Sequence, residues 1–337
     1  MKTKAIVFAD VGKVEFVEVD IPQPNPDEVL VRSSLSGISV GTDGWYVTGK
    51  YSAVRDRYPV IYGYSRVGVV EEVGSEVETL EAGQRVFVGT PKTRLVPGKF
   101  GNSCGNYTGW GCHKSEDVVP IPDSVSDEEA TMVGLASVPV VGRDLTGISP
   151  DDLVVVLGQG MIGQSAAQLC RVQGAKVITA DPLQQRVELS ESYSSDIAVN
   201  IRLEDLASVV FNESSSGADV VFECAGRSDT MDLILDIVRG GCNDSEKSGK
   251  VCMQGYFPNP ITIDFHSAHM RRLTMTFPCG FDVAGSKEIM KLLDKRQINL
   301  SPLITHEWDL EQAPQAFQYM IDRPGYVLGM FIRWSNN

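Results

Sequence analysis

Positive charge is scarce in this chain of 337 residues, which has 30 lysine and arginine residues against 44 aspartate and glutamate residues. The formal net charge at pH 7 is −14, and the basic residues form no local cluster along the sequence. A protein that binds nucleic acid or an anionic membrane surface depends on such a cluster. The composition therefore argues against nucleic acid and membrane as partners and favours a small-molecule partner.

Long apolar runs and a dense cysteine pattern are also missing. No run approaches the roughly 20 apolar residues that span a membrane, and Met1 is not followed by a basic segment and an apolar stretch. The seven cysteines are odd in number and scattered, unlike the closely spaced cysteines of a small secreted scaffold. We therefore expect a soluble, cytoplasmic protein whose cysteines are mostly reduced and buried.

The order of apolar segments predicts an α/β fold with about two domains. The first third of the chain reads as short strands separated by turns, and residues 127–145 read as a connecting helix with acidic residues in its first turn. From residue 153 onward, strand candidates alternate with helical or polar stretches, which is typical of a doubly wound parallel sheet. The strand candidates are residues 4–8, 14–19, 28–33, 67–73, 153–157, 176–181, 196–201, 218–226, 249–257 and 273–280.

A glycine pattern directly after the strand candidate 153–157 predicts a dinucleotide site. Gly158, Gly160 and Gly163 have the G-x-G-x-x-G spacing, and a helical pattern begins with Met161 and Ile162. The first glycine permits a tight turn, the second lets the backbone approach a pyrophosphate, and the third lets the helix pack closely on the strand. The alternative is an ordinary glycine turn in an unrelated α/β protein.

Two further groups of residues complete the predicted cofactor site. Asp181 ends the next strand candidate about 20 residues after the glycines, where its carboxylate can accept hydrogen bonds from a ribose and repel a 2′-phosphate. This favours NAD over NADP, although Arg186 lies nearby and could weaken the preference. Cys224, Ala225 and Gly255 lie at the ends of later strand candidates and are expected to line the ribose and nicotinamide, Cys224 through its backbone.

The chain as a whole resembles the medium-chain dehydrogenase/reductase superfamily. The segments that carry the resemblance are "GISVGTDGWYVTG", "YPVIYGYSRVGVVEEVG", "AGQRVFVG", "VVPIPD", the glycine pattern and "ITHEWDLEQAPQAF". The resemblance implies a GroES-like partial β-barrel domain, residues 1–146 completed by 301–337, and a Rossmann domain, residues 147–300. It further implies an active site between the two domains and a homodimer formed through the Rossmann edge strand near residues 273–277.

Within this family the zinc-dependent members are the point of comparison. The turn "GQGMIG" is closer to polyol and alcohol dehydrogenases than to zinc-free quinone reductases, yet the zinc ligands are absent. The family's cysteine falls here on Ser39 or Val40, and its glycine-histidine-glutamate is here Gly63-Tyr64-Ser65. Hydroxyl groups are poor zinc ligands, so the sequence predicts no catalytic zinc.

A second zinc site is not expected either. The family's structural zinc lobe needs four cysteines, whereas this chain offers Cys104, Cys112 and His113. The segment around "SGIS" is also similar to the bacteriochlorophyllide a dehydrogenase group. We do not expect this chain to share the substrate of that group, because Asp43 stands where the group has glutamate.

If zinc is absent, another group must stabilise the substrate oxygen. Tyr64 is our first candidate for general acid and base, with Thr42, Asp43 and His113 as further catalytic candidates. Each has a structural alternative: Tyr64 as an aromatic filling the former zinc pocket, Thr42 and Asp43 as loop or capping residues, and His113 as a buried structural histidine. Tyr46, Ser65 and Arg66 are the candidates for substrate binding, where Arg66 could anchor an acidic substrate or pair with a carboxylate.

Three functions follow from these residues. The leading hypothesis is a zinc-independent NAD(H)-linked oxidoreductase that interconverts a secondary alcohol and a ketone. The first alternative is an NAD(P)H-dependent reductase of an activated C=C or C=N bond, which needs no Lewis acid. The second is an NAD(H)-binding regulator without catalytic activity. The substrate itself depends on loops whose conformation the sequence does not reveal, chiefly residues 51–58 and 91–106.

Overall fold

The computed structural model describes residues 1–50, 58–89, 93–94, 100–102, 105–240, 247–257 and 259–334. The chain divides into two compact units. Unit 1 comprises Met1–Leu135, Asp282–Arg296 and Leu300–Asn337, and unit 2 comprises Ala136–Phe281 and Gln297–Asn299. The loops predicted to shape the substrate pocket lie largely outside the described residues, as does Cys104.

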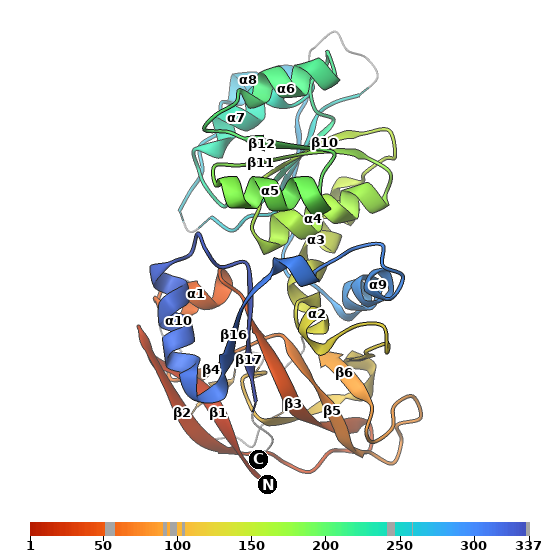
Figure 1. The fold of residues 1–337 in the computed structure, drawn as a ribbon, viewed down its shortest axis with the longest axis vertical. Helices are drawn as coiled ribbons and strands as arrows, with labels where there is room; N and C mark the ends of the chain where they lie inside the picture. Colours follow the sequence, from red (N-terminus) through yellow and green to blue (C-terminus); the bar gives the residue numbers. More distant parts are fainter. Residues whose placement is uncertain are drawn as a thin grey trace. The chain divides into compact units, whose positions relative to one another are not determined.

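Unit 1 consists mainly of β-structure. Its elements are β1 (Lys2–Asp10), β2 (Lys13–Asp20), β3 (Glu28–Ile38), α1 (Thr42–Val47), β4 (Val60–Ile61), β5 (Arg66–Val73), β6 (Arg85–Val88), β7 (Gly101–Asn102), β8 (Trp110–Lys114), η1 (Ser115–Asp117), β9 (Val118–Pro120), α2 (Asp127–Thr131), α9 (Val283–Asp294), η2 (Ser301–Leu303), β16 (Ile304–Asp309), η3 (Leu310–Gln312), α10 (Ala313–Asp322) and β17 (Gly329–Arg333). One sheet has the order β2-β1-β4-β7 and the other β16-β17-β3-β5-β6-β9, with β8 also paired to β3 (Figure 1). β17 near the C-terminus pairs with β3, so the C-terminal segment adds to the N-terminal sheet.

Aromatic rings form the centre of the core that includes α1. Phe8, Tyr107 and Phe317 come from β1, from the segment before β8 and from α10, and all three are buried. Their ring centroids lie 5.1 to 6.2 Å apart in edge-to-face arrangements, which are favourable for aromatic pairs. Three parts of the chain that are distant in sequence therefore pack together in the core that includes α1.

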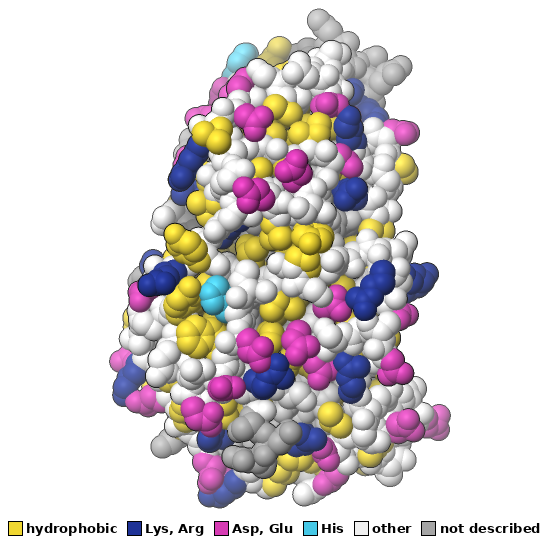
Figure 2. Space-filling view, in the orientation of Figure 1, with side chains coloured by type: hydrophobic (Ala, Val, Ile, Leu, Met, Phe, Trp, Pro, Cys, Tyr) yellow, Lys and Arg dark blue, Asp and Glu magenta, His cyan; other side chains and the backbone are white. Residues whose placement is uncertain are grey.

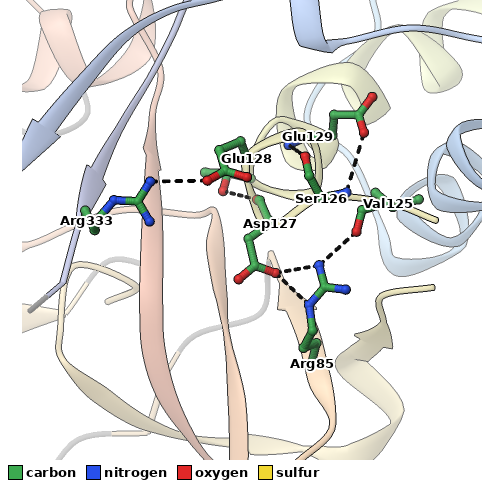
Figure 3. A network of polar contacts seen from close by, with 8 residues as sticks. Arg85, Val125, Ser126, Asp127, Glu128, Glu129 and Arg333 are labelled. Carbon is green, nitrogen blue, oxygen red and sulfur yellow. Dashed lines mark hydrogen bonds and ion pairs between the residues drawn. The ribbon is translucent and has the colours of Figure 1, made fainter. Parts of the chain in front are cut away.

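Helix α2 begins at a polar network that Figure 3 shows. Ser126 and Glu129 form a capping box, in which the Ser126 hydroxyl accepts from the Glu129 amide. Asp127 accepts from Arg85 of β6, and Glu128 accepts from Arg333 of β17 (Figure 3). The acidic first turn expected from the sequence is confirmed. The single helix predicted for residues 127–145 is instead two, because α2 ends at Thr131 and α3 (Val133–Thr146) begins after Met132.

Unit 2 is the predicted doubly wound fold. Its elements after α3 are β10 (Leu153–Leu157), α4 (Met161–Val172), β11 (Lys176–Asp181), α5 (Gln184–Tyr193), β12 (Ile197–Asn200), α6 (Leu206–Glu213), β13 (Val220–Glu223), α7 (Thr230–Ile237), β14 (Lys250–Met253), α8 (Phe265–Met270) and β15 (Thr274–Thr276). The strands have the order β12-β11-β10-β13-β14-β15, and each neighbouring pair is parallel.

Side chains that alternate along β10 explain why helices cover both faces of this sheet. Val154 and Val156 pack in one cluster with Cys170 of α4. Val155 and Leu157 pack in another cluster that contains residues of α6 and α7. Because both faces are buried, the strand is apolar at every position, as expected for a parallel sheet with two helical layers. The α/β fold class predicted from the sequence is confirmed.

The charge distribution agrees with the absence of a basic cluster in the sequence. On the face shown in Figure 2, lysine and arginine side chains lie scattered among aspartate and glutamate side chains. Among the residues that the structure describes, no helix has the length and apolar character needed to cross a membrane.

Candidate functional site

The glycine loop of unit 2 has the shape that the sequence pattern predicts. Gly158 has a φ of +85°, and a β-carbon there would lie 2.8 Å from the backbone of Ala225. A β-carbon at Gly163 would lie 1.8 Å from the carbonyl oxygen of Gly158. These two positions therefore require glycine on steric grounds. Gly160, the N-cap of α4, has no atom within 4 Å of where its β-carbon would be, so open space remains for a ligand to approach the backbone.

The first turn of α4 points its amide groups toward this open space, as a helix N-terminus does. Met161 is buried and Ile162 is half-buried, so their side chains anchor the first turn of α4 in the protein. The backbone amides of the turn stay available for hydrogen bonds to a ligand. Helix α4 is uncapped by any side chain at Gly160. A pyrophosphate would satisfy the amide groups that a capping side chain otherwise takes.

Asp181 lies at the end of β11, directly beside the glycine loop. Its Oδ2 accepts from the Gln159 amide at 2.7 Å and its Oδ1 accepts from the Leu183 amide at 2.8 Å. An ionised carboxylate can accept about four hydrogen bonds, so acceptor positions remain for ribose hydroxyls. Arg186 lies 3.7 Å from Oδ2 of Asp181, so part of its charge is compensated within the protein.

Glu223 shapes the turn after β13, where Cys224 and Ala225 lie, and sequence reasoning did not assign it a role. Its carboxyl group is buried and accepts from the amides of Ala225 and Gly226. A β-carbon at Gly255 would lie 2.5 Å from Glu223 Oε2, which explains the glycine there. Burial raises the pKa of Glu223 and raises the pKa of the half-buried Cys224 thiol well above its usual value. The backbone of the Cys224 turn, rather than its thiol, is therefore suited to line a ligand.

In unit 1, the candidates Asp43 and Tyr46 both lie on α1. Asp43 is 1% exposed, and its Oδ2 accepts from the Ser39 amide at 2.8 Å and from the Tyr107 hydroxyl. Its Oδ1 is buried and has no hydrogen-bond partner among the residues that the structure describes. Desolvation raises the pKa of Asp43 to about 7, although the hydrogen bond from Tyr107 partly opposes this.

The tyrosine candidates form a stacked group. The Tyr46 ring stacks on Tyr62 at a centroid distance of 3.9 Å, and Tyr62 meets Tyr64 edge to face at 5.9 Å. Tyr64 is half-buried, whereas Tyr46 and Tyr62 are buried, so Tyr64 is the ring of this group with the most access to a ligand. Thr42 is also half-buried, and its amide donates to the Ser39 hydroxyl at 3.3 Å.

Arg66 and His113 are brought together in the interior of unit 1. Both are buried, and Arg66 Nη1 lies 2.7 Å from His113 Nε2. Burial lowers the pKa of Arg66 to about 9, so the guanidinium stays charged at neutral pH and Nε2 must accept its hydrogen bond. Burial and the Arg66 charge hold the pKa of His113 well below its ordinary value. The roles of Arg66 in substrate binding and of His113 in catalysis stay predictions. In the structure each side chain is a hydrogen-bond partner of the other.

The residues at the family's zinc positions do not fit a zinc ion. Ser65 donates its hydroxyl proton to the Thr131 carbonyl oxygen at 2.5 Å, and the Ser39 hydroxyl is occupied by the Thr42 amide. Val40 has no ligand atom, and Tyr64 offers a phenol. Three strong zinc ligands are therefore not provided at these positions.

Cys112 and His113 do not converge on a common metal position either. As neighbours on β8 they point to opposite faces. The Cys112 thiol lies 3.2 Å from the Pro22 carbonyl oxygen in a cluster with Ile21 and Leu30, whereas His113 faces Arg66. One metal ion could not bind both side chains in this arrangement.

Tyr107 is the residue of unit 1 that sequence reasoning missed. Its ring packs on Gly63, where a β-carbon would lie 2.7 Å from the ring, and its hydroxyl reaches Asp43. It therefore connects the two motifs that differ from the zinc-dependent members. The only signal in the sequence was an aromatic residue within "CGNYTGWG", and nothing in that segment indicates the contact with Asp43.

Comparison with known proteins gives matches in both units. The family model "Alcohol dehydrogenase GroES-like domain" matches residues 25–123, and "Zinc-binding dehydrogenase" matches residues 162–295. An L-threonine 3-dehydrogenase of Pyrococcus abyssi is 28% identical over 347 residues, which are 95% of this chain and 94% of the relative. A D-xylulose reductase of Saccharomyces cerevisiae is 26% identical over 346 residues, 95% of each chain.

A solved structure from Sinorhizobium meliloti, provisionally identified as a zinc-binding dehydrogenase and bound to NADP, has the same fold. Its TM-score is 0.83 at 22% sequence identity, and the match covers 99% of each chain. At this identity the likeness concerns the fold alone.

Proposed function

Because this chain belongs to the medium-chain dehydrogenase/reductase superfamily and is therefore an NAD(P)-dependent oxidoreductase, we propose that it interconverts a secondary alcohol and a ketone with NAD(H) and without zinc. The activities that the two relatives' names denote are reduction of a ketose and dehydrogenation of a hydroxy amino acid. Both interconvert a hydroxyl and a carbonyl group. The substrate of this chain is expected to be a small molecule of the same chemical class.

The observation that carries the proposal is the set of side chains at the zinc positions. Ser39 and Ser65 use their hydroxyl groups within the protein, and Tyr64 is the half-buried phenol that precedes Ser65 in sequence. A phenol can donate a hydrogen bond to a carbonyl oxygen and stabilise the negative charge that develops on it. Tyr64 is therefore proposed to donate a hydrogen bond to the substrate oxygen in place of the zinc ion. Thr42 on α1 carries a half-buried hydroxyl that is proposed to assist it.

The cofactor preference rests on Asp181. The amides of the glycine loop and of the α4 N-terminus would hold the pyrophosphate, and Asp181 would accept hydrogen bonds from the adenosine ribose. Its carboxylate is buried beside the loop and would repel a 2′-phosphate, while Arg186 is already partly neutralised by it. When bound, NADH would supply the hydride for ketone reduction, and oxidised NAD would accept it in alcohol oxidation. Ala225 and Gly255 are proposed to line the nicotinamide end through their backbone.

A substrate survey tests the reaction class. Oxidation of NADH and NADPH would be measured with ketones, enones and imines, reduction of NAD with secondary alcohols, and bound zinc by elemental analysis. We expect NADH-dependent ketone reduction by protein that contains no stoichiometric zinc. Turnover of enones or imines alone would establish the reductase alternative. Tight NADH binding without turnover in any class would instead indicate a regulator.

Substitution of Tyr64 tests the residue assignment. We expect Tyr64→Phe to lower kcat about 100-fold, the usual contribution of a positioned acid or base, with NADH affinity unchanged. Tyr62→Phe is the matched control, because Tyr62 belongs to the same aromatic group but is buried. Equal turnover in wild type and Tyr64→Phe would remove Tyr64 from the mechanism.

A further inference from the structure

The Asp43 carboxyl group lies in surroundings that do not favour a negative charge. Among the described residues no cation forms an ion pair with it, and Oδ1 is buried without a partner. Phe8 of β1 and Phe317 of α10 flank the Tyr107 ring, and burial, Asp43 and the phenols of Tyr64 and Tyr62 all raise the pKa of Tyr107. An ionised carboxylate with an unpartnered buried oxygen is costly, whereas the carbonyl oxygen of a neutral acid tolerates the same position better.

Tyr107 can accept a hydrogen bond from the proton of a neutral Asp43 carboxyl group. Its hydroxyl oxygen contacts Asp43 Oδ2 and also lies 3.3 Å from the Gly37 carbonyl oxygen. When Asp43 is neutral, Oδ2 can donate to the Tyr107 oxygen while the Tyr107 proton points to Gly37. When Asp43 is ionised, the Tyr107 hydroxyl can rotate and donate to Oδ2, where the Ser39 amide also donates. Both protonation states therefore have a complete set of hydrogen bonds at Oδ2.

We propose that Asp43 and Tyr107 form a buried pair that stores one proton for the reaction, with Tyr107 as the positioning residue that allows Asp43 to release and regain it. This inference rests on the proposed function. In ketone reduction, bound NADH would supply the hydride. Tyr64 would then give its hydroxyl proton to the substrate oxygen, and the stored proton would restore the Tyr64 phenol. The pair is then left as an Asp43 carboxylate that accepts from Tyr107, and it regains a proton from solvent. In alcohol oxidation the same proton moves in the reverse direction.

Two observations connect the pair with Tyr64. The Tyr64 ring meets Tyr62 edge to face at 5.9 Å, and the Tyr107 amide donates to the Tyr62 carbonyl oxygen at 3.0 Å. The Tyr107 ring also packs on Gly63, the residue that precedes Tyr64, and the Asn106 amide donates to the Gly63 carbonyl oxygen at 3.1 Å. The segment that carries Tyr107 therefore fixes the backbone that carries Tyr64.

Infrared spectroscopy tests the pair without requiring turnover. In the full-length protein without added substrate, we expect a band of a protonated carboxyl group that disappears with a midpoint near pH 7. Asp43→Asn should lack this band. Because the Tyr107 hydrogen bond lowers the Asp43 pKa, Tyr107→Phe should move the midpoint to higher pH while keeping the ring contacts with Phe8 and Phe317. Tyr319→Phe, which removes a phenol bonded to His306 instead, should leave the midpoint unchanged. A missing band in wild type, or the same midpoint in Tyr107→Phe, would overturn the pair.

The pH profile of kcat then tests the connection with the reaction. We expect its midpoint to shift upward in Tyr107→Phe, parallel to the infrared midpoint. Turnover with identical pH profiles in wild type and Tyr107→Phe would show that the pair does not serve the reaction. If the infrared results hold but no alcohol or ketone is turned over, the pair stands and the proposed reaction fails.

Discussion

The glycine loop of unit 2 and the altered motifs of unit 1 hold their functional groups in different ways. In the loop, positions are set by backbone geometry between residues close in sequence, such as Gly158 and Gly163. In unit 1, Asp43 depends on Tyr107, 64 residues away, and Arg66 depends on His113, 47 residues away. The loop presents amide groups to a ligand, whereas the motifs bury charged groups among apolar side chains.

Each region is therefore sensitive to a different kind of substitution. The backbone loop is damaged by adding an atom at Gly158 or Gly163, because these two positions have no space for one. A buried polar pair is damaged by removing an atom, because its partner is left without a hydrogen bond.

The largest expected effect is on the pH dependence of stability at Asp43. Its pKa is raised from 3.8 to about 7 in the folded protein, so the native state holds a proton that the unfolded state releases. The free energy of unfolding should therefore fall as pH rises from 3.8 to about 7. The fall is on the order of 4 kcal/mol. Asp43→Asn should lose this part of the pH dependence.

Urea unfolding at a series of pH values measures this effect. The difference between wild type and Asp43→Asn isolates Asp43 from other titrating groups, such as His306. Parallel curves for the two proteins across this range would contradict a raised pKa at Asp43. Asp205→Asn, at the exposed N-cap of α6, is the control and should not remove this fall.

The first prediction concerns a contact that the sequence did not reveal. The strands, the glycine loop and Asp181 could be predicted because their signals are local: alternation along strands, fixed glycine spacing, and a carboxylate at a strand end. The contact between Asp43 and Tyr107 joins a short helix to a loop. The contact between Arg66 and His113 depends on how β8 and β5 pair with β3. Such contacts follow from strand register and packing, which one sequence without relatives does not specify.

The next effect is steric and concerns Gly163. Gly163→Ala should lower the free energy of unfolding by about 3 kcal/mol and abolish NAD binding, because the new β-carbon would lie 1.8 Å from the Gly158 oxygen. Gly160→Ala is the matched variant. The space around it is open, so we expect a cost below about 1 kcal/mol from the weaker N-cap but a clear loss of NAD affinity. Thermal unfolding and calorimetric titration with NAD would separate the two. Equal stability of the two variants would show that the loop is not sterically closed at Gly163.

A smaller effect is expected at the edge of the unit 2 sheet. β15 is the last strand in the sheet order, and Phe277, just after it, is 64% exposed. An open strand edge beside an exposed apolar side chain is suited to pairing with a second copy. If the predicted homodimer forms there, Phe277→Glu should weaken it by about 2 kcal/mol. Leu203→Glu, an exposed apolar position after β12 at the opposite edge, should leave it unchanged. Sedimentation at several concentrations measures both, and equal dissociation constants would place the contact elsewhere.

The smallest effect is expected for the cofactor preference at Asp181. Asp181→Asn keeps the size of the side chain and an oxygen for the Gln159 or Leu183 amide, but it removes the charge that repels a 2′-phosphate. It also leaves Arg186 without its ion-pair partner Asp181. We expect the ratio of NAD to NADP affinity to fall about tenfold, or about 1.4 kcal/mol. Fluorescence titrations with both cofactors measure the ratio, and an unchanged ratio would mean that the backbone around Asp181, rather than its charge, selects the cofactor. Because both carboxylate oxygens accept amide hydrogen bonds, Asp181 is a candidate of unit 2 that could fail in the manner of unit 1, by loss of a partner.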